Sequence, residues 1–103
     1  MQNNQKYSID EIQKALIPIA RKYEVKRIAI FGSYARGEAD ASSDIDLHLI
    51  ETGGLWGYFK LYSFKHELEA CFGRAVDVLT TGAMDDEVLE RVRKEEVLLY
   101  EHQ

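Results

Sequence analysis

The chain has 103 residues, enough for one small domain with one hydrophobic core and too few for two. An apolar fraction of 46% and a charged fraction of 30% are ordinary for a globular protein and exclude a disordered chain. The net charge of −5 argues against a broad basic surface that would attract nucleic acid. We therefore expect a single domain over residues 1–103 that does not bind nucleic acid directly.

Sequence features that predict export or membrane insertion are missing. No apolar run approaches the ~18 to 20 residues that cross a bilayer. The polar segment over residues 1–6 lacks the apolar core of a signal peptide. Cys71 is the one cysteine and cannot form an internal disulfide. These features predict a cytoplasmic protein with no membrane partner.

The first predicted element is a helix over residues 8–23. Its start is a capping box at Ser8, which is followed by apolar residues at helical spacing. Pro18 removes one backbone hydrogen bond inside this helix, so the sequence predicts a kink or an early end near Ile17.

The remaining elements follow from β-branched runs, helical spacing and turn residues. Strands are predicted over residues 25–31, 45–50 and 74–79, with a short fourth strand over 97–100 at the sheet edge. Two more helices are predicted over residues 56–72, ending at a left-handed Gly73, and over 85–94, where acids precede bases. Polar loops are expected over residues 37–43 and 80–82.

Gly32 and Ser33 follow the first strand and are candidate phosphate-binding residues. A glycine lets the backbone approach a ligand closely, and the N–H groups of such a turn can bind phosphate. Taken alone, a turn that merely redirects the chain is the favoured alternative. Arg36 either binds a triphosphate through its guanidinium or forms a surface ion pair with Glu38 or Asp40, and the sequence leaves both open.

Asp44, Asp46 and Asp77 are candidate metal ligands. Strand alternation places Asp44 and Asp46 on one face. The apolar residues of that strand lie on the other face, at Ile45, Leu47 and Leu49. Adjacent carboxylates repel each other, so they need a cation or shared protons. Alternatively, Asp44 caps a turn and Asp46 is solvated. Asp77 favours the cation, because it stands unpartnered in an apolar strand.

If the two strands are neighbours, the three carboxylates converge at a two-metal site for displacement at phosphorus. Their oxygens favour magnesium, with manganese as a substitute. Asp44 and Asp46 would then hold both metals. Asp77 would complete one of them and accept the proton of the attacking hydroxyl.

The motif Gly32-Ser33, ten residues, then Asp44-Ile45-Asp46 resembles the signature of polymerase-beta-like nucleotidyltransferases. The resemblance extends through Asp77, so all three family carboxylates have matching positions, and the short length is similar to the minimal nucleotidyltransferase (MNT) branch. The resemblance implies an α/β (α+β) fold with a small mixed β-sheet of three to four strands flanked by helices. It also implies magnesium-dependent transfer of a nucleotide, with ATP as donor.

Members of the MNT branch are often encoded beside a HEPN-domain protein and act as its antitoxin. The resemblance therefore implies that this chain binds a HEPN toxin and transfers AMP from ATP to a tyrosine on it. A non-catalytic antitoxin that binds nucleotide and masks its partner is the main alternative. A small-molecule acceptor such as an aminoglycoside is a third reading, against which the absence of an extra helical domain argues.

The predicted second helix carries more aromatic residues than one buried stripe needs. They are Trp56, Tyr58, Phe59, Tyr62, Phe64 and Phe72. We expect most to pack in the core and the surplus to mark a protein interface. His48 is interpreted as an ordinary strand residue, His66 as a surface residue and Cys71 as a buried apolar residue.

Overall fold

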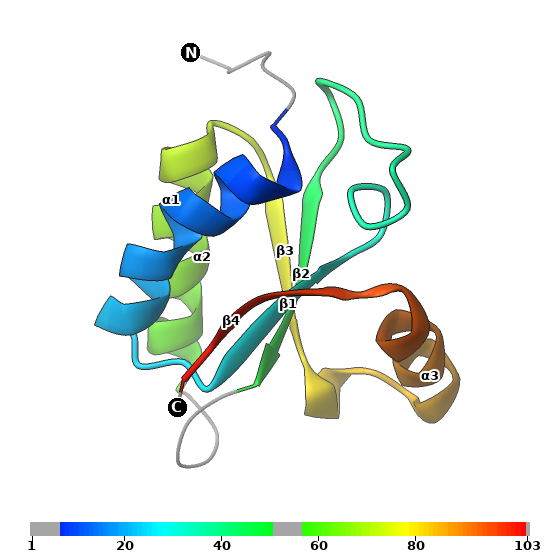
Figure 1. Cartoon of the computed structure of the whole chain (residues 1–103). Helices are drawn as coiled ribbons and strands as arrows, with labels where there is room; N and C mark the ends of the chain where they lie inside the picture. The colour runs from blue at the N-terminus through cyan, green and yellow to red at the C-terminus, as the bar shows by residue number, and fades with distance from the viewer. Residues whose placement is uncertain (1–6, 51–56, 103) are drawn as a thin grey trace.

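The structure of the protein, a computed structural model, describes residues 7–50 and 57–102. Over these ranges, a four-stranded sheet is covered on one face by α1 and α2, while α3 lies on the other side (Figure 1). The predicted order of helices and strands is confirmed, with a 3-10 turn added before α3. No helix in the described part of the chain is long and apolar enough to cross a membrane.

The first helix, α1 (Ile9–Lys22), begins at the predicted capping box. The Ser8 hydroxyl accepts the Glu11 N–H, and the Glu11 carboxylate accepts the Ser8 N–H. The helix continues through Pro18, so the predicted early end does not occur. Pro18 is exposed, and the carbonyl it leaves unbonded belongs to exposed Lys14, where water can serve as donor.

The sheet consists of β1 (Arg27–Phe31), β2 (Ile45–Ile50), β3 (Val76–Thr80) and β4 (Val97–Glu101). Their order is β3-β2-β1-β4, with β1 antiparallel to β2 and β4 and with β2 parallel to β3. This is the predicted mixed sheet, and β4 lies at its edge as expected. The sheet places the end of β1 beside the starts of β2 and β3.

Several predicted boundaries are wrong by one or two residues, including the start of β3, which lies at Val76 and not at residue 74. β1 starts at Arg27, because Glu24 turns the chain with a φ of 56° before it enters the sheet. The predicted loop over 80–82 is instead the end of β3 and a 3-10 turn, η1 (Thr81–Ala83). The third helix, α3 (Asp86–Glu95), starts after Asp85, whose carboxylate caps it by accepting the Val88 N–H.

The second helix, α2 (Tyr58–Phe72), ends at Gly73 in the predicted left-handed conformation. The predicted start at Trp56 lies outside the described residues. The expectation that most of the aromatic residues pack in the core is wrong for the described ones, because α2 turns Phe64, Leu68 and Phe72 toward the core. Tyr58, Phe59 and Tyr62 are exposed. The prediction that Cys71 is buried is wrong, because in the last turn of α2 the core takes up Phe72 and leaves its neighbour at the surface.

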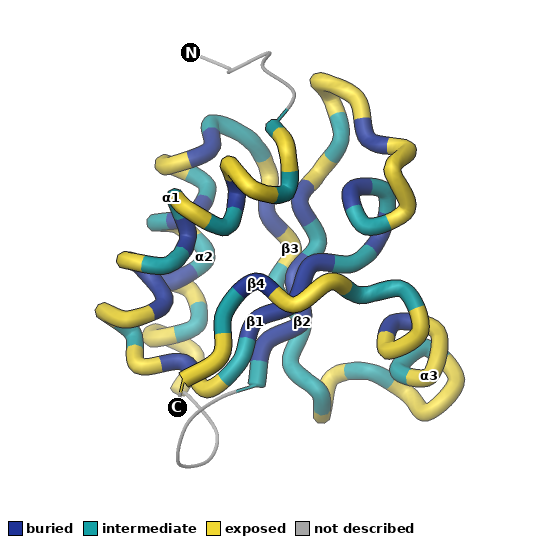
Figure 2. The backbone as a smooth tube through the Cα atoms, viewed as in Figure 1, coloured by how far each residue is buried: buried dark blue, intermediate teal, exposed yellow. Residues whose placement is uncertain are grey.

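The hydrophobic core lies between the sheet and the α1 and α2 pair. Each strand contributes alternate residues to it, so that Ile45, Leu47 and Leu49 of β2 are fully buried. Figure 2 shows this buried layer along the strands and the inner sides of the two helices. Within the part of the chain that the structure describes, the opposite sheet face, called here the open face, carries Asp46, His48 and Asp77 and is partly covered by α3.

Candidate active site

Two of the predicted carboxylates are neighbours on the open face. Asp46 and Asp77 are paired in register across β2 and β3. Both face away from the core, because the residues that flank Asp46, Ile45 and Leu47, are completely buried on the other side. Asp44 is exposed and immediately precedes β2. The structure thus places Asp46 against Asp77, with Asp44 one residue before the start of β2.

The electrostatics of Asp46 show an excess of negative charge. Partial burial, followed by repulsion from Asp77 and a hydrogen bond with it, raises the pKa of Asp46 to about 6. The charge of Asp44 raises this pKa further, and only Arg36 opposes the effect. At neutral pH the ionised carboxylate of Asp46 therefore lowers the stability of the folded state. A bound cation would relieve the repulsion.

Gly32 lies directly against Asp46. It has a φ of 74°, which only glycine adopts readily, and a Cβ atom added there would overlap the Oδ2 of Asp46. The backbone of the turn can therefore reach the carboxylates only because residue 32 has no side chain. A turn that merely redirected the chain would not need this contact.

The residues that follow Gly32 form a short helical turn. The Arg36 N–H donates to the Gly32 carbonyl at 3.1 Å, and the Glu38 N–H donates to the Ser33 carbonyl at 2.9 Å. The first N–H groups of such a turn have no acceptor within it. One of them, the Gly32 N–H, donates to the Oε1 of Glu95 at 3.1 Å. Ser33 is half-buried at the start of this turn.

Arg36 forms ion pairs with two acidic residues. Its Nε donates to Glu38 at 2.8 Å, and one terminal nitrogen donates to the two Glu95 oxygens at 3.4 and 3.2 Å. The hydrogen bonds from Glu38 and then Glu95 raise the pKa of the guanidinium. The predicted pair with Glu38 is thus observed, whereas Asp40 accepts hydrogen bonds from Ser42 and Ser43 instead.

A pocket of about 340 Å³ connects these groups. Its walls come from the end of β1, the turn, β2 and α3. The lining residues are Phe31, Gly32, Arg36, Asp46, Val88, Arg91, Val92 and Glu95. Arg91 and Glu95 were not predicted, because α3 lies far along the chain and its charges follow the pattern of an ordinary exposed helix. A positive charge from α3 thus faces the same pocket as Arg36.

His48 is part of a buried polar network, so its interpretation as an ordinary strand residue is wrong. The side chain is 1% exposed; its Nδ1 lies 2.7 Å from Glu96 and its Nε2 lies 2.8 Å from Thr81. Glu96 also accepts a hydrogen bond from Arg27 at 3.1 Å. This network fixes the end of α3 to β1 and β2. The sequence signal was the period of two, which puts His48 on the same face as Asp46.

Arg74 joins the two loops that border the carboxylates. One terminal nitrogen donates to the Tyr34 hydroxyl at 2.7 Å and to the Ser43 carbonyl at 3.5 Å, and the guanidinium lies over the Tyr7 ring. Tyr34 belongs to the glycine turn, and Ser43 precedes Asp44. Arg74 therefore holds the turn and the start of β2 at a fixed separation.

The donor atoms at this site fit magnesium. Within residues 7–50 and 57–102, no group of three or more His, Cys, Asp or Glu residues forms a preassembled metal site. The carboxylate set is instead open, with Asp46 and Asp77 in contact and Asp44 nearby. Magnesium is commonly held by one or two carboxylates together with substrate phosphates, so an open set of oxygen donors suits it better than a closed cage.

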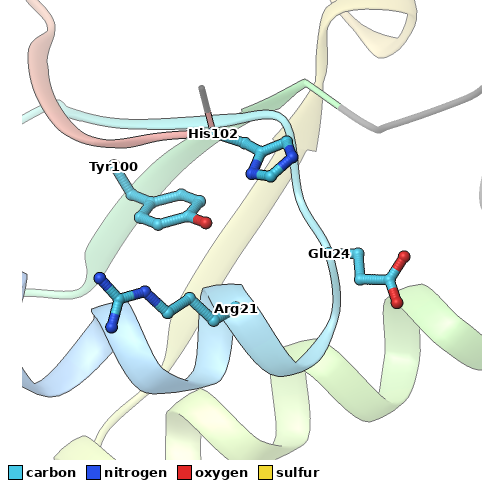
Figure 3. A pocket seen from close by; sticks show the side chains of 4 residues that line it. All are labelled: Arg21, Glu24, Tyr100 and His102. Carbon is cyan, nitrogen blue, oxygen red and sulfur yellow. The ribbon is translucent and has the colours of Figure 1, made fainter.

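A second hollow, of about 370 Å³, lies between the end of α1 and β4. It is lined by Arg21, Glu24, Tyr100 and His102, and Figure 3 shows the Glu24 carboxylate pointing away from the other three side chains. No convergent set of charged groups is present there. The carboxylate pocket is therefore the candidate active site.

Comparison with known proteins identifies relatives of this chain. A candidate protein adenylyltransferase of Methanocaldococcus jannaschii is 43% identical over 90 residues, covering 87% of this chain and 96% of the relative. Protein adenylyltransferase MntA of Thermococcus cleftensis is 29% identical over 94 residues, covering 87% and 94%.

The fold is shared with an MNT antitoxin complex of known structure. A chain of the tri-AMPylated Shewanella oneidensis HEPN toxin in complex with MNT antitoxin superposes with a TM-score of 0.70 at 18% identity, covering 92% of this chain and 74% of that chain. The family model described as polymerase beta, nucleotidyltransferase matches residues 14–103. The chain therefore belongs to the polymerase beta nucleotidyltransferase family and is a nucleotidyltransferase, as its sequence predicted.

Proposed function

We propose that the protein transfers AMP from ATP to a tyrosine hydroxyl of a partner HEPN toxin and thereby acts as an antitoxin. The observation that carries the proposal is the Asp46–Asp77 pair directly against a glycine turn that has no room for a side chain. Displacement at phosphorus requires concentrated carboxylates beside a phosphate-binding backbone, and this arrangement supplies both. The names of the relatives support protein as the acceptor.

In this proposal Asp44, Asp46 and Asp77 are the metal-binding and catalytic residues. A bound magnesium ion, for which manganese can substitute, supplies positive charge to the reacting phosphates and lowers the pKa of the attacking hydroxyl. Asp46 lies deepest, between Gly32 and Asp77, and orients the site. Asp77 lies on the edge strand β3, where an acceptor can approach it, and takes the proton of the hydroxyl.

Gly32, Ser33 and Arg36 bind the phosphates of the nucleotide in this proposal. The turn supplies backbone N–H groups, Ser33 supplies a hydroxyl and Arg36 supplies a guanidinium fork. Arg91 joins them from α3, because it lines the same pocket. Arg36 and Arg91 then neutralise part of the negative charge on the departing pyrophosphate.

A protein partner is supported by the exposed surface of α2. Tyr58, Phe59 and Tyr62 are 74%, 82% and 49% exposed, although the same helix supplies large residues to the core. Aromatic side chains gathered at a surface are typical of protein interfaces. The similar MNT chain is seen in complex with a HEPN toxin, which supports a HEPN protein as the partner here.

The proposal is tested by co-expressing this chain with its partner HEPN protein and measuring the intact mass of that partner after incubation with the chain, ATP and magnesium. We expect the partner to gain one or more AMP units and the Asp44→Ala/Asp46→Ala double variant to add none. Peptide mapping then locates the modified residue, which we expect to be a tyrosine. An unchanged mass would contradict the proposed transfer.

The alternative is a non-catalytic antitoxin that binds nucleotide and masks its partner. A different outcome of the same experiment would favour it. If a stable complex forms without any mass change, and Asp46→Ala still neutralises the toxin, then the partner is blocked by contact alone. A cytosolic location and a single domain over residues 1–103 stay predictions.

A further inference from the structure

Glu95, in the last turn of α3, occupies a site built for an anion. Its Oε1 accepts the Gly32 N–H at 3.1 Å, and the Arg36 guanidinium lies 3.2 and 3.4 Å from its two oxygens. We call the Gly32 N–H and the Arg36 guanidinium together the anion site. The Glu95 side chain is 28% exposed, so solvent weakens these bonds only in part.

These donors are the ones that bind phosphate in the proposed function, on which this inference rests. A carboxylate oxygen and a phosphate oxygen are both charged acceptors, and one N–H cannot donate fully to both. The Nε of Arg36 is already engaged by Glu38. A phosphate that accepts the Gly32 N–H must therefore replace the carboxylate of Glu95, because this group has a single hydrogen to donate.

The neighbouring contacts allow Glu95 to leave without the helix moving. Glu96, the next residue, is held by His48 and Arg27, and Val92 is the residue of α3 that is buried. These contacts fix the end of α3 while the Glu95 side chain remains at the rim of the pocket. A change of its rotamer is sufficient to open the anion site.

We propose that Glu95 is an intramolecular stand-in for phosphate that regulates nucleotide binding at this pocket. A triphosphate binds by displacing it, so the apparent affinity is lower than the anion site alone would give. After transfer, the carboxylate competes with pyrophosphate for the same donors and favours its release. Glu95 thus lowers the apparent affinity of every anion that uses the anion site by the same factor.

The test is titration calorimetry of wild-type protein, Glu95→Gln and Glu90→Gln with magnesium and the non-hydrolysable analogue AMP-PNP. Glu90→Gln is the matched control, because Glu90 lies on the same exposed helix, pairs with Lys94 and does not line this pocket. We expect Glu95→Gln to tighten binding about five- to tenfold, the range for loss of one competing, partly solvated charged hydrogen bond. Glu90→Gln should change it less than about twofold.

A second measurement follows the anion site directly. The Gly32 amide resonance should shift in Glu95→Gln and, in the wild type, on addition of AMP-PNP, while melting temperatures confirm that each variant is folded. Unchanged or weaker binding by Glu95→Gln would mean that Glu95 positions Arg36 or plays no part, and would overturn this inference alone. Absence of AMP-PNP binding to all three proteins would overturn the proposed function with it.

Discussion

The two faces of the sheet are made by the same strands but serve different purposes. Toward α1 and α2, alternate residues such as Leu47 and Leu49 are completely buried among apolar side chains. Toward the open face, β2 carries Asp46 and His48 at the alternating positions. The helix that partly covers this face, α3, has one buried side chain. Stability is thus concentrated on one face, whereas the other holds charges whose repulsion opposes folding.

This difference between the two faces explains how a chain of 103 residues can carry a polar site. A strand has two independent surfaces, so a carboxylate at one position does not disturb the packing of its neighbour. Substitutions one residue apart in β2 should therefore have separate consequences.

Asp77→Asn should remove catalysis while leaving the fold intact. The change keeps the shape of the side chain but removes the charge that holds the cation and accepts the proton. We expect the rate of AMP transfer to fall by at least about 10³-fold, corresponding to about 4 kcal/mol of barrier. Mass spectrometry of the partner measures the rate, and an unchanged circular dichroism spectrum controls for folding. Retention of more than a tenth of the activity would exclude Asp77 as a catalytic residue.

Leu47→Ala should do the opposite, because Leu47 lies on the buried face next to Asp46. Removing its side chain leaves a cavity in the core and should lower the free energy of unfolding by about 3 kcal/mol. Leu98→Ala is the matched control, since Leu98 is a strand leucine that is 44% exposed, and it should lose less than about 1 kcal/mol. Urea denaturation compares the two. Equal losses of unfolding free energy would show that burial does not determine how much Leu47 and Leu98 contribute to stability.

Local patterns in the sequence predicted much of this division. The capping box at Ser8, the left-handed Gly73 and the alternation of β2 depend on neighbouring residues, so they could be read directly. That Asp77 needs a partner was also predictable from its apolar strand, but its pairing with Asp46 was conditional on β2 and β3 being neighbours, which the structure shows.

Contacts between distant residues could not be predicted in the same way. Glu95 meets Gly32 across 63 positions, and Arg74 meets Tyr34 across 40. Neither contact has a local signature, because each depends on the docking of one element against another. His48 is intermediate: its face was predictable from alternation, but its partner Glu96 was not.

His48→Leu tests whether the open face also contributes to stability. The substitution removes the ring nitrogen that lies beside the Glu96 carboxylate, which is 8% exposed, and leaves Arg27 as the observed partner of that carboxylate. We expect a loss of about 2 kcal/mol in the free energy of unfolding. His66→Leu, the same change at an exposed site on α2, should be nearly neutral. If the two variants unfold at the same denaturant concentration, the His48 network does not fix α3 to the sheet.

Asp46→Asn should stabilise the metal-free protein. This is the smallest of the expected effects, and it raises the free energy of unfolding where the other stability variants lower it. The pKa of Asp46 is raised to about 6 in the folded state, so protonation of this carboxyl stabilises the fold. This stabilisation is fully present below the unfolded pKa of about 4 and is lost as the pH rises through 6. Above that pH the ionised carboxylate opposes folding, whereas asparagine stays neutral. The variant should gain about 1 kcal/mol at pH 7.5, a figure that allows for solvent screening of a half-buried group.

The pH and magnesium dependence separate this explanation from a general effect of lost charge. The difference between Asp46→Asn and wild type should vanish near pH 4 and shrink again when magnesium stabilises the wild type, because a bound cation relieves the same repulsion. Asp86→Asn, which removes a charge from the exposed first turn of α3, should show neither trend. A wild type that is as stable as Asp46→Asn without magnesium at pH 7.5 would mean that the repulsion is already neutralised within the protein. The open face would then impose no energetic penalty, and the contrast between the two faces would be one of packing alone.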